Sequence, residues 1–298
     1  MPKKCYIEKK FSKASAAIIK QANAIIEEYQ KSGFSLTLRQ LYYQFVSRDL
    51  IANKVTEYSR LGAIISDARL AGLIDWESII DRTRNLASLA HWTSPQSIIS
   101  ACAEQYRIDK WMQQPVRLEV WVEKEALIGV VKHACDPLDV PHFACKGYTS
   151  QSEMWEAGQR ILRYKEKGQD TVIIHLGDHD PSGIDMTRDI TDRLQLFMGA
   201  SDIQRIALNW DQIEKYKPPP NPAKTTDSRF ESYESLYGTE SWELDAIDPS
   251  TLSKLITDKI LEFRDEDAWE MSARLEDEQK DDLYFAARHW KKLVENRK

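Results

Sequence analysis

Two short stretches carry most of the structural information in this sequence: Val120-Trp121-Val122-Glu123-Lys124-Glu125 and His175-Leu176-Gly177-Asp178-His179-Asp180-Pro181-Ser182-Gly183. Each follows an apolar run with the pattern of a β-strand, so its carboxylates stand where a strand ends. In an open α/β sheet, ligands bind at the carboxyl ends of the strands. Glu123, Asp178 and Asp180 are therefore expected to meet there and to form an oxygen-rich site for Mg²⁺ or Mn²⁺. This arrangement predicts a metal-dependent enzyme that acts on phosphates.

The composition is that of a chain with folded cores. Its 298 residues are enough for about two domains, and a hydrophobic content of 42% argues against wholesale disorder. No apolar run approaches the ~18 residues of a membrane span, and no signal peptide is evident, so no membrane association is expected. The four scattered cysteines favour a reducing, cytoplasmic location over a disulfide framework.

Charge is divided unevenly along the chain, whose formal net charge is −6. Residues 1–84 carry 14 Lys and Arg against 9 Asp and Glu, whereas residues 85–298 carry 27 against 38. A basic N-terminal region followed by an acidic C-terminal region fits a DNA-contacting module attached to a carboxylate-rich metal domain. Ordinary charge fluctuation is the alternative interpretation.

The front of the chain has the pattern of a small helical domain. A polar helix is expected at about 13–30, and Thr37 can cap a second helix after the break at Gly33. One apolar stripe follows the spacing i, i+3, i+4, i+7 and consists of Leu38, Leu41, Tyr42 and Phe45. Tyr42 is therefore predicted to belong to the core.

Tyr43 lies one step round that second helix and is predicted to be exposed. Arg39 precedes it by four residues, on the same helix face. An exposed tyrosine with an arginine beside it is a candidate nucleophile with a phosphate clamp. An ordinary surface tyrosine is the alternative.

A third helix is expected to face Leu61, Ile64, Ile65 and Ala68 inward and to present Arg60 and Arg69 outward until it ends at Gly72. Residues 73–84 are then predicted to form a short β-wing tipped by Arg82 and Arg84. Helices followed by a basic wing indicate a winged helix-turn-helix that binds DNA in a groove. A helical domain without DNA contacts stays open as the alternative.

The second half of the chain alternates strands and helices. Strands are predicted at 118–122, 140–144 and 171–176, each followed by a helix, which is typical of a parallel sheet in an α/β domain. Residues 218–229 are expected to form a proline-rich loop in which Lys224 and Arg229 reach DNA, with a plain surface connector as the alternative. The charged stretch 263–298 is predicted to be helical, as a structural cap or a dimer element.

These motifs resemble those of a known family. The segment with one Glu and an Asp-x-Asp is similar to a Toprim domain. The wider pattern resembles the A subunit of topoisomerase VI and the related meiotic double-strand-break transesterase, and most of all their short stand-alone Mini-A relatives. The resemblance covers about residues 35–250 and uses the motifs Arg39-Gln40-Leu41-Tyr42-Tyr43, Val122-Glu123-Lys124, Lys146-Gly147-Tyr148, Asp178-His179-Asp180-Pro181-Ser182-Gly183 and Trp242-Glu243-Leu244-Asp245-Ala246.

The resemblance implies a fold with four parts. These are a winged-helix domain at 1–95, a linker at 96–114, a Toprim domain at 115–250 and a helical C-terminal extension at 251–298. It also implies that Tyr43 is the nucleophile and Arg39 its phosphate-binding neighbour. Glu123, Asp178 and Asp180 would hold Mg²⁺ or Mn²⁺. The family usually has Asp where this chain has Gln40, a departure that weakens the tyrosine assignment.

The implied activity is DNA cleavage by tyrosine transesterification, with a covalent 5′-phosphotyrosyl intermediate, as in the catalytic subunit of a type IIB topoisomerase. The implied partners are double-stranded DNA, a second copy of the chain whose metal site would meet each tyrosine, and a separate ATPase subunit, because this sequence has no ATP-binding motif. The implied location is a prokaryotic nucleoid, or a virus or mobile element. The basic residues expected to contact DNA are Arg60, Arg69, Arg82, Arg84, Lys146, Lys224 and Arg229.

Two other functions stay open. In a Toprim nuclease, for example one used in defence, metal-activated water would cut DNA without a catalytic tyrosine, and Gln40 favours that alternative. A DNA-binding or interaction protein with an inactive site is the third interpretation, which the intact set of three acids disfavours.

Overall fold

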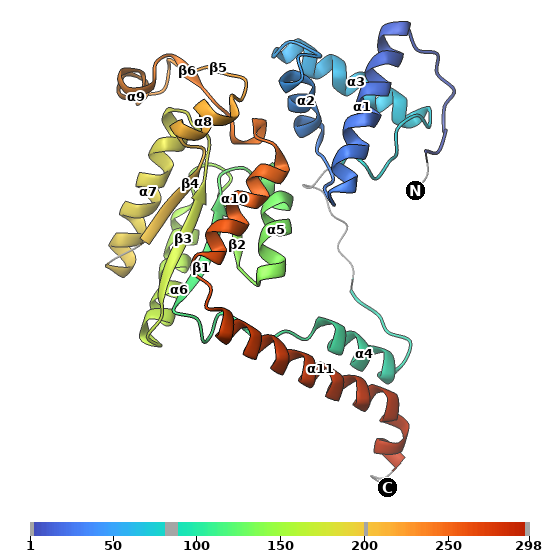
Figure 1. Ribbon diagram of the computed structural model, residues 1–298, viewed down its shortest axis with the longest axis vertical. Helices are drawn as coiled ribbons and strands as arrows, with labels where there is room; N and C mark the ends of the chain where they lie inside the picture. Colours follow the sequence, from blue (N-terminus) through green and yellow to red (C-terminus); the bar gives the residue numbers. More distant parts are fainter. Residues whose placement is uncertain (1–2, 81–88, 200–201, 296–298) are drawn as a thin grey trace.

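The computed structural model describes residues 3–80, 89–199 and 202–295 (Figure 1). A bundle of three N-terminal helices packs against one end of an α/β body, and two helices, α4 and α11, extend from the other end of that body. The fold class is therefore α/β, as predicted.

The N-terminal bundle consists of α1 (Lys13–Lys31), α2 (Leu38–Ser47) and α3 (Val55–Leu70). The predicted cap of the second helix is confirmed, because Thr37 Oγ1 accepts from the backbone N–H of Gln40 at 3.2 Å. Gln40 Oε1 accepts in return from the N–H of Thr37 at 2.9 Å. Gln40 therefore helps to stabilise the start of α2 through a reciprocal capping box.

The predicted β-wing is absent from the described part of 73–84. Residues 73–80 form turns with a single bridge from Ile79 to Leu36. The turn is held locally, since Asp75 accepts from the Glu77 N–H at 2.8 Å and its carbonyl accepts from Ser78 Oγ at 2.7 Å. Side chains that bond to nearby backbone groups compete with strand pairing, and here they prevail. The predicted wing tip lies outside the described residues.

The body contains one parallel sheet with the strand order β2-β1-β3-β4. Its strands are β1 (Val116–Val122), β2 (His142–Ala144), β3 (Asp170–Leu176) and β4 (Asp202–Ala207). The three predicted strands are confirmed, whereas β4 was not anticipated. β1 and β3 are the two inner strands, so the predicted acidic stretches leave the middle of the sheet side by side.

Helices cover both faces of the sheet (Figure 1). On one face α5 (Ile128–Cys135) and α10 (Pro249–Leu261) pack on alternate strand residues such as Val120 and Ile174. On the other face α6 (Gln151–Glu166) and α7 (Pro181–Met198) cover Trp121 and Ile173. Both faces of a parallel sheet are normally buried in this way.

Short elements form the crest of the body, which lies beyond the carboxyl ends of the strands. They are the turn η1 (Glu125–Leu127), the helices α8 (Trp210–Tyr216) and α9 (Phe230–Tyr237), the hairpin β5 (Asn221–Pro222) with β6 (Glu240–Ser241), and the 3₁₀ turn η3 (Leu244–Ala246). A further turn, η2 (Asp136–Leu138), follows α5. Ala246 of η3 belongs to the apolar core of the N-terminal bundle, so the two parts share one packed contact.

The region 96–114, expected to be a linker, contains most of α4 (Pro95–Gln105). This helix lies along α11 (Glu266–Glu295), which confirms the predicted helical C-terminus (Figure 1). Lys110 Nζ and the Ile108 N–H both bind the buried carboxylate of Glu276, at 2.6 and 3.1 Å, and so fasten the segment after α4 to α11. None of the helices in the described ranges combines the length and the apolar character needed to cross a membrane.

Candidate functional site

The acids predicted at the sheet edge do lie together. The register pairs Val122 with Leu176, which places Glu123 and Asp178 just beyond the ends of adjacent strands. Glu123 Oε2 accepts from the backbone N–H of Asp178 at 2.8 Å. The third acid, Asp180, caps α7, and its Oδ1 accepts from the Gly183 N–H at 2.6 Å.

Two glycines form a close cradle around the Glu123 carboxylate. A Cβ atom on Gly177 would lie 3.0 Å from Glu123 Oε2, and one on Gly183 would lie 3.1 Å from it. A Cβ on Gly183 would also lie 2.3 Å from the Asp178 carbonyl oxygen, well inside van der Waals contact. The glycine at the end of the Asp-x-Asp motif is thus required by the close approach of α7 to the loop that carries the acids.

Lys124, which follows the first acid, lies in a cage of carboxylates. Its Nζ is 2.8 Å from Asp178 Oδ2, 3.0 Å from Glu243 Oε2 and 3.1 Å from Asp245 Oδ1. Burial lowers the pKa of the ammonium, but the three anions outweigh burial and raise it, so Lys124 stays charged. One cation therefore joins the sheet edge to η3.

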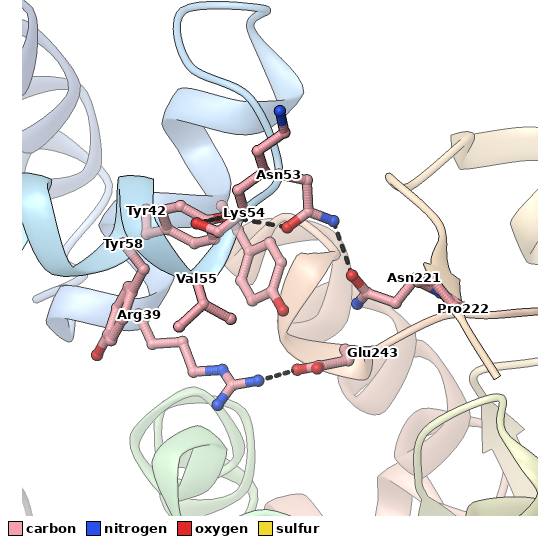
Figure 2. Close-up of a pocket in the computed structure, with 10 residues that line it drawn as sticks. Arg39, Tyr42, Asn53, Lys54, Val55, Tyr58, Asn221, Pro222 and Glu243 are labelled. Carbon is pink, nitrogen blue, oxygen red and sulfur yellow. Dashed lines mark hydrogen bonds and ion pairs between the residues drawn. The ribbon is translucent and has the colours of Figure 1, made fainter. Parts of the chain in front are cut away.

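Arg39 reaches the same carboxylates from α2. Its Nε is 3.0 Å from Asp245 Oδ2, and its Nη2 pairs with Glu243 (Figure 2). Burial would raise the pKa of Glu243, but Lys124 and Arg39 outweigh it and lower the pKa to about 2. A continuous series of ion pairs thus runs from Arg39 through Glu243 and Asp245 to Lys124 and Asp178.

Tyr43 is buried, contrary to the expectation that it is exposed. Only 3% of its surface is accessible. The helical periodicity described α2 by itself, but the side of α2 opposite its first apolar stripe packs against η3. The predicted neighbourhood of Arg39 is confirmed, with its Cζ 5.8 Å from the Tyr43 ring centroid. Burial and the Asp245 and Glu243 carboxylates raise the pKa of Tyr43, while Arg39 opposes this rise.

Two cavities open on the series of ion pairs. The larger, about 540 Å³, is lined by Arg39, Tyr43 and Glu243 together with residues of α3 and β5 (Figure 2). The smaller, about 320 Å³, is lined by Arg39, Glu123, Lys124 and Asp245 among others. Arg39 therefore borders both the space beside the tyrosine and the space beside the sheet-edge acids.

The chemistry of the acids suits a divalent cation in part. Burial and the nearby Asp180 carboxylate raise the pKa of Glu123, and burial raises that of Asp178 to about 7. A bound cation would offset the cost of burying these negative charges so close together. Glu123 Oε1 and Asp180 Oδ2 have no hydrogen bond or ion pair within the described ranges, whereas both oxygens of Asp178 are engaged, by Lys124 and the Leu244 N–H. Within the same ranges, no three or more His, Cys, Asp or Glu side chains are arranged to hold a metal ion.

Arg205 of β4 holds the loop that carries Asp178 and Asp180 through hydrogen bonds to the backbone. Its guanidinium donates to the carbonyls of Gly177, Asp178 and Gly183 at 2.7 to 2.9 Å. Burial lowers its pKa to about 10, so it remains a cation beside Glu123. The sequence interpretation missed this residue because it did not identify the strand that carries it.

His179, between the two motif aspartates, is buried and does not face solvent. Its ring is surrounded by aromatic side chains, and its Nδ1 lies 2.8 Å from the Tyr233 hydroxyl. Burial and the neighbouring Arg205 lower its pKa to about 4, which keeps the imidazole neutral. It anchors the motif in the crest through reciprocal backbone hydrogen bonds with Trp242.

The helix arginines expected to contact DNA have protein partners. Arg60 pairs with Glu57 on its own helix. Arg69 does not point outward as predicted, because its guanidinium donates to the carbonyls of Trp76 and Ile79 and holds the turn after α3. Arg82 and Arg84 lie outside the described residues.

The three basic residues expected from loops differ in their surroundings. Lys146 is exposed and pairs with Glu125 at 2.9 Å. Arg229 is engaged by Asp227 and Asp185. Lys224 is exposed, and its ammonium has no ion pair or hydrogen bond within the described ranges.

Lys124, Glu243 and Asp245 stood in motifs quoted from the sequence, but no role was predicted for them. The Glu-x-Asp spacing of 243 and 245 was the available signal, because a 3₁₀ turn can direct both side chains toward one cation.

Comparison with protein-family models, with curated proteins and with solved structures finds no match to this chain.

Proposed function

We propose that this protein cleaves double-stranded DNA by metal-dependent tyrosine transesterification. In this proposal it is the catalytic subunit of a type IIB topoisomerase-like system, with a winged-helix domain before a Toprim domain. It would act as a homodimer with a separate ATPase subunit. The observation that supports the proposal is the series of ion pairs between Arg39, which lies beside Tyr43, and Asp178. Residues from three distant motifs meet in that series.

In the proposed reaction the Tyr43 hydroxyl oxygen attacks a DNA phosphorus and the bond from phosphorus to the 3′ oxygen breaks. The products are a 5′-phosphotyrosyl enzyme and a free 3′ hydroxyl. Arg39 would stabilise the negative phosphoryl oxygens. The Tyr43 hydroxyl would give its proton to Asp245 or Glu243, the carboxylates beside it, and the leaving 3′ oxygen would take up a proton from solvent to become the hydroxyl.

Glu123 and Asp180, with Asp178 shared with Lys124, are the residues that would hold Mg²⁺ or Mn²⁺. When bound there, the ion would supply electrostatic stabilisation of charge on the phosphodiester. Arg205 would keep the loop of these acids in place through its backbone contacts.

A specific observation also favours a second candidate, a nuclease that hydrolyses DNA with water. Tyr43 is buried and its pKa is raised, so forming its phenolate is unfavourable in this arrangement. In the hydrolytic alternative Tyr43 would be a packing residue, and the acids of the sheet edge would hold the metal ion that activates the attacking water.

The test is cleavage of supercoiled plasmid with Mg²⁺ or Mn²⁺, stopped by detergent and divided into protease-treated and untreated halves. Transesterification predicts protein attached to the 5′ ends, and this attachment disappears in Tyr43→Phe. Free ends that persist in Tyr43→Phe and vanish in Asp178→Ala would instead establish hydrolysis. Uncut plasmid with both ions would overturn both candidates.

A further inference from the structure

The 540 Å³ cavity beside Tyr43 has the size and lining of a ligand site. It lies between the α2–α3 part of the N-terminal bundle and the β5 hairpin of the body, so its walls come from segments about 170 residues apart (Figure 2). Its apolar wall consists of the side chains of Tyr42, Tyr43, Tyr58, Val55 and Pro222. Aromatic and apolar walls of this kind accommodate flat, partly apolar groups.

A relay of hydrogen bonds fixes the polarity of the opposite wall. The Tyr42 hydroxyl donates to Asn53 Oδ1 at 3.0 Å, and Asn53 Nδ2 donates to Asn221 Oδ1 at 2.8 Å. The Pro220 carbonyl, which can only accept, lies 3.3 Å from Asn53 Nδ2 and so sets the orientation of that amide. Asn221 Oδ1 therefore faces Asn53, and the Asn221 Nδ2 group is left to donate to another partner.

Asn221 Nδ2 has no hydrogen-bond partner within the described ranges. The relay thus ends in N–H donors at the cavity. Arg39 supplies a cation at the other end of the lining, whereas the Lys54 ammonium is directed away from Arg39 (Figure 2). Glu243 Oε2 is already paired with both Arg39 and Lys124. The free amide donors at the Asn221 end call for a ligand with hydrogen-bond acceptors, and the Arg39 guanidinium at the other end can meet a negative charge.

We propose that this cavity binds a nucleotide, with its base against the tyrosine wall and its phosphate toward Arg39. A nucleobase supplies a flat apolar face together with ring-nitrogen or carbonyl acceptors for Asn221 Nδ2. The nucleotide comes either from DNA, as a base unstacked beside the cleaved phosphate, or from solution. The first source rests on the proposed DNA cleavage, whereas the second does not.

Two variants test the two halves of the cavity. Val55→Trp fills it from an exposed position, since Val55 is 82% accessible. Asn221→Asp keeps an oxygen that accepts from Asn53 but replaces the free donors by an acceptor. The matched controls are Leu196→Trp on exposed α7 and Gln105→Glu at the end of α4, which add the same ring and the same charge far from the cavity.

Binding is measured in EDTA, so that no metal-dependent cleavage contributes. One arm titrates the four deoxynucleoside monophosphates by calorimetry. The other follows the fluorescence of DNA duplexes with single 2-aminopurine substitutions, which rises when the base leaves the stack. We expect binding in at least one arm, weakened about tenfold or more by each cavity variant, because Val55→Trp occupies the space of the base and Asn221→Asp sets an acceptor against the acceptors of the ligand. The controls should change it less than twofold.

The two arms identify the source. Binding of monophosphates without a 2-aminopurine signal assigns the cavity to a free nucleotide, and a 2-aminopurine signal lost in both variants assigns it to an unstacked DNA base. No binding in either arm overturns the proposal, as does binding that survives both variants. Because neither readout needs cleavage, an inactive enzyme that still binds nucleotides would refute only the proposed function.

Discussion

Replacing Lys124 by methionine should destabilise the fold far more than the loss of an ordinary surface charge. Methionine keeps much of the length of the side chain and removes the charge, which leaves Asp178, Glu243 and Asp245 close together without the cation that they share. Only 21% of the Lys124 side chain is accessible, and that of Asp245 is fully buried. Water therefore screens these charges poorly.

The expected magnitude follows from Glu243. Lys124, Arg39 and a hydrogen bond from Tyr43 together hold its pKa at about 2, against an ordinary 4.5, and this difference corresponds to about 3 kcal/mol of stability at neutral pH, of which Lys124 supplies the largest part. Removal of one partner of a buried ion pair costs about 3–5 kcal/mol in general, so we expect Lys124→Met to lose about 3 kcal/mol. A carboxyl with a lowered pKa stabilises the fold above its unfolded value. The part of the difference that comes from Glu243 should therefore shrink as the pH falls from 4.5 toward 2.

Urea unfolding followed by tryptophan fluorescence at pH 7 measures this cost. The matched control is Lys254→Met, which removes an exposed ion pair with Asp258 on α10 and should cost less than about 0.5 kcal/mol. A loss below about 1 kcal/mol in Lys124→Met would refute the reasoning, because the carboxylates would then be separated or hydrated more than the distances indicate.

Two further variants test the surroundings of the acids. Gly183→Ala should lose about 1–3 kcal/mol in urea unfolding, because its Cβ would lie 2.3 Å from the Asp178 carbonyl oxygen and α7 would have to shift. Gly62→Ala, which meets only the flexible Leu38 Cδ2 at 3.2 Å, should be neutral or stabilising, and equal losses in the two variants would contradict the close approach. For His179, a folded pKa of about 4 against 6.5 means that the unfolded chain binds more protons between these values, so stability falls as the pH drops through 6.5. Wild type should lose about 2 kcal/mol more than His179→Phe between pH 7.5 and 5, and parallel pH profiles would show that the imidazole is not held neutral.

Much of the fold could be predicted because it depends on local patterns. The three N-terminal helices and the Thr37 cap follow from apolar spacing and from a side chain that bonds to the backbone three residues away. The inner strands β1 and β3 follow from continuous apolar runs. The β4 strand was missed because most of its side chains are only partly buried, so its apolar pattern is weak.

The candidate site could likewise be predicted only where it depends on local patterns. The sequence by itself determined that Glu123 and Asp178 meet, because parallel strands must end at the same edge of a sheet. Only the tertiary structure decided that Tyr43 is buried, that Lys124 joins Asp178 to Asp245, and that Asn221 completes a cavity begun by α2. These contacts join residues far apart in the chain. Helical periodicity describes one element against its own core, and it carries no information about the second surface that packing brings against the other side.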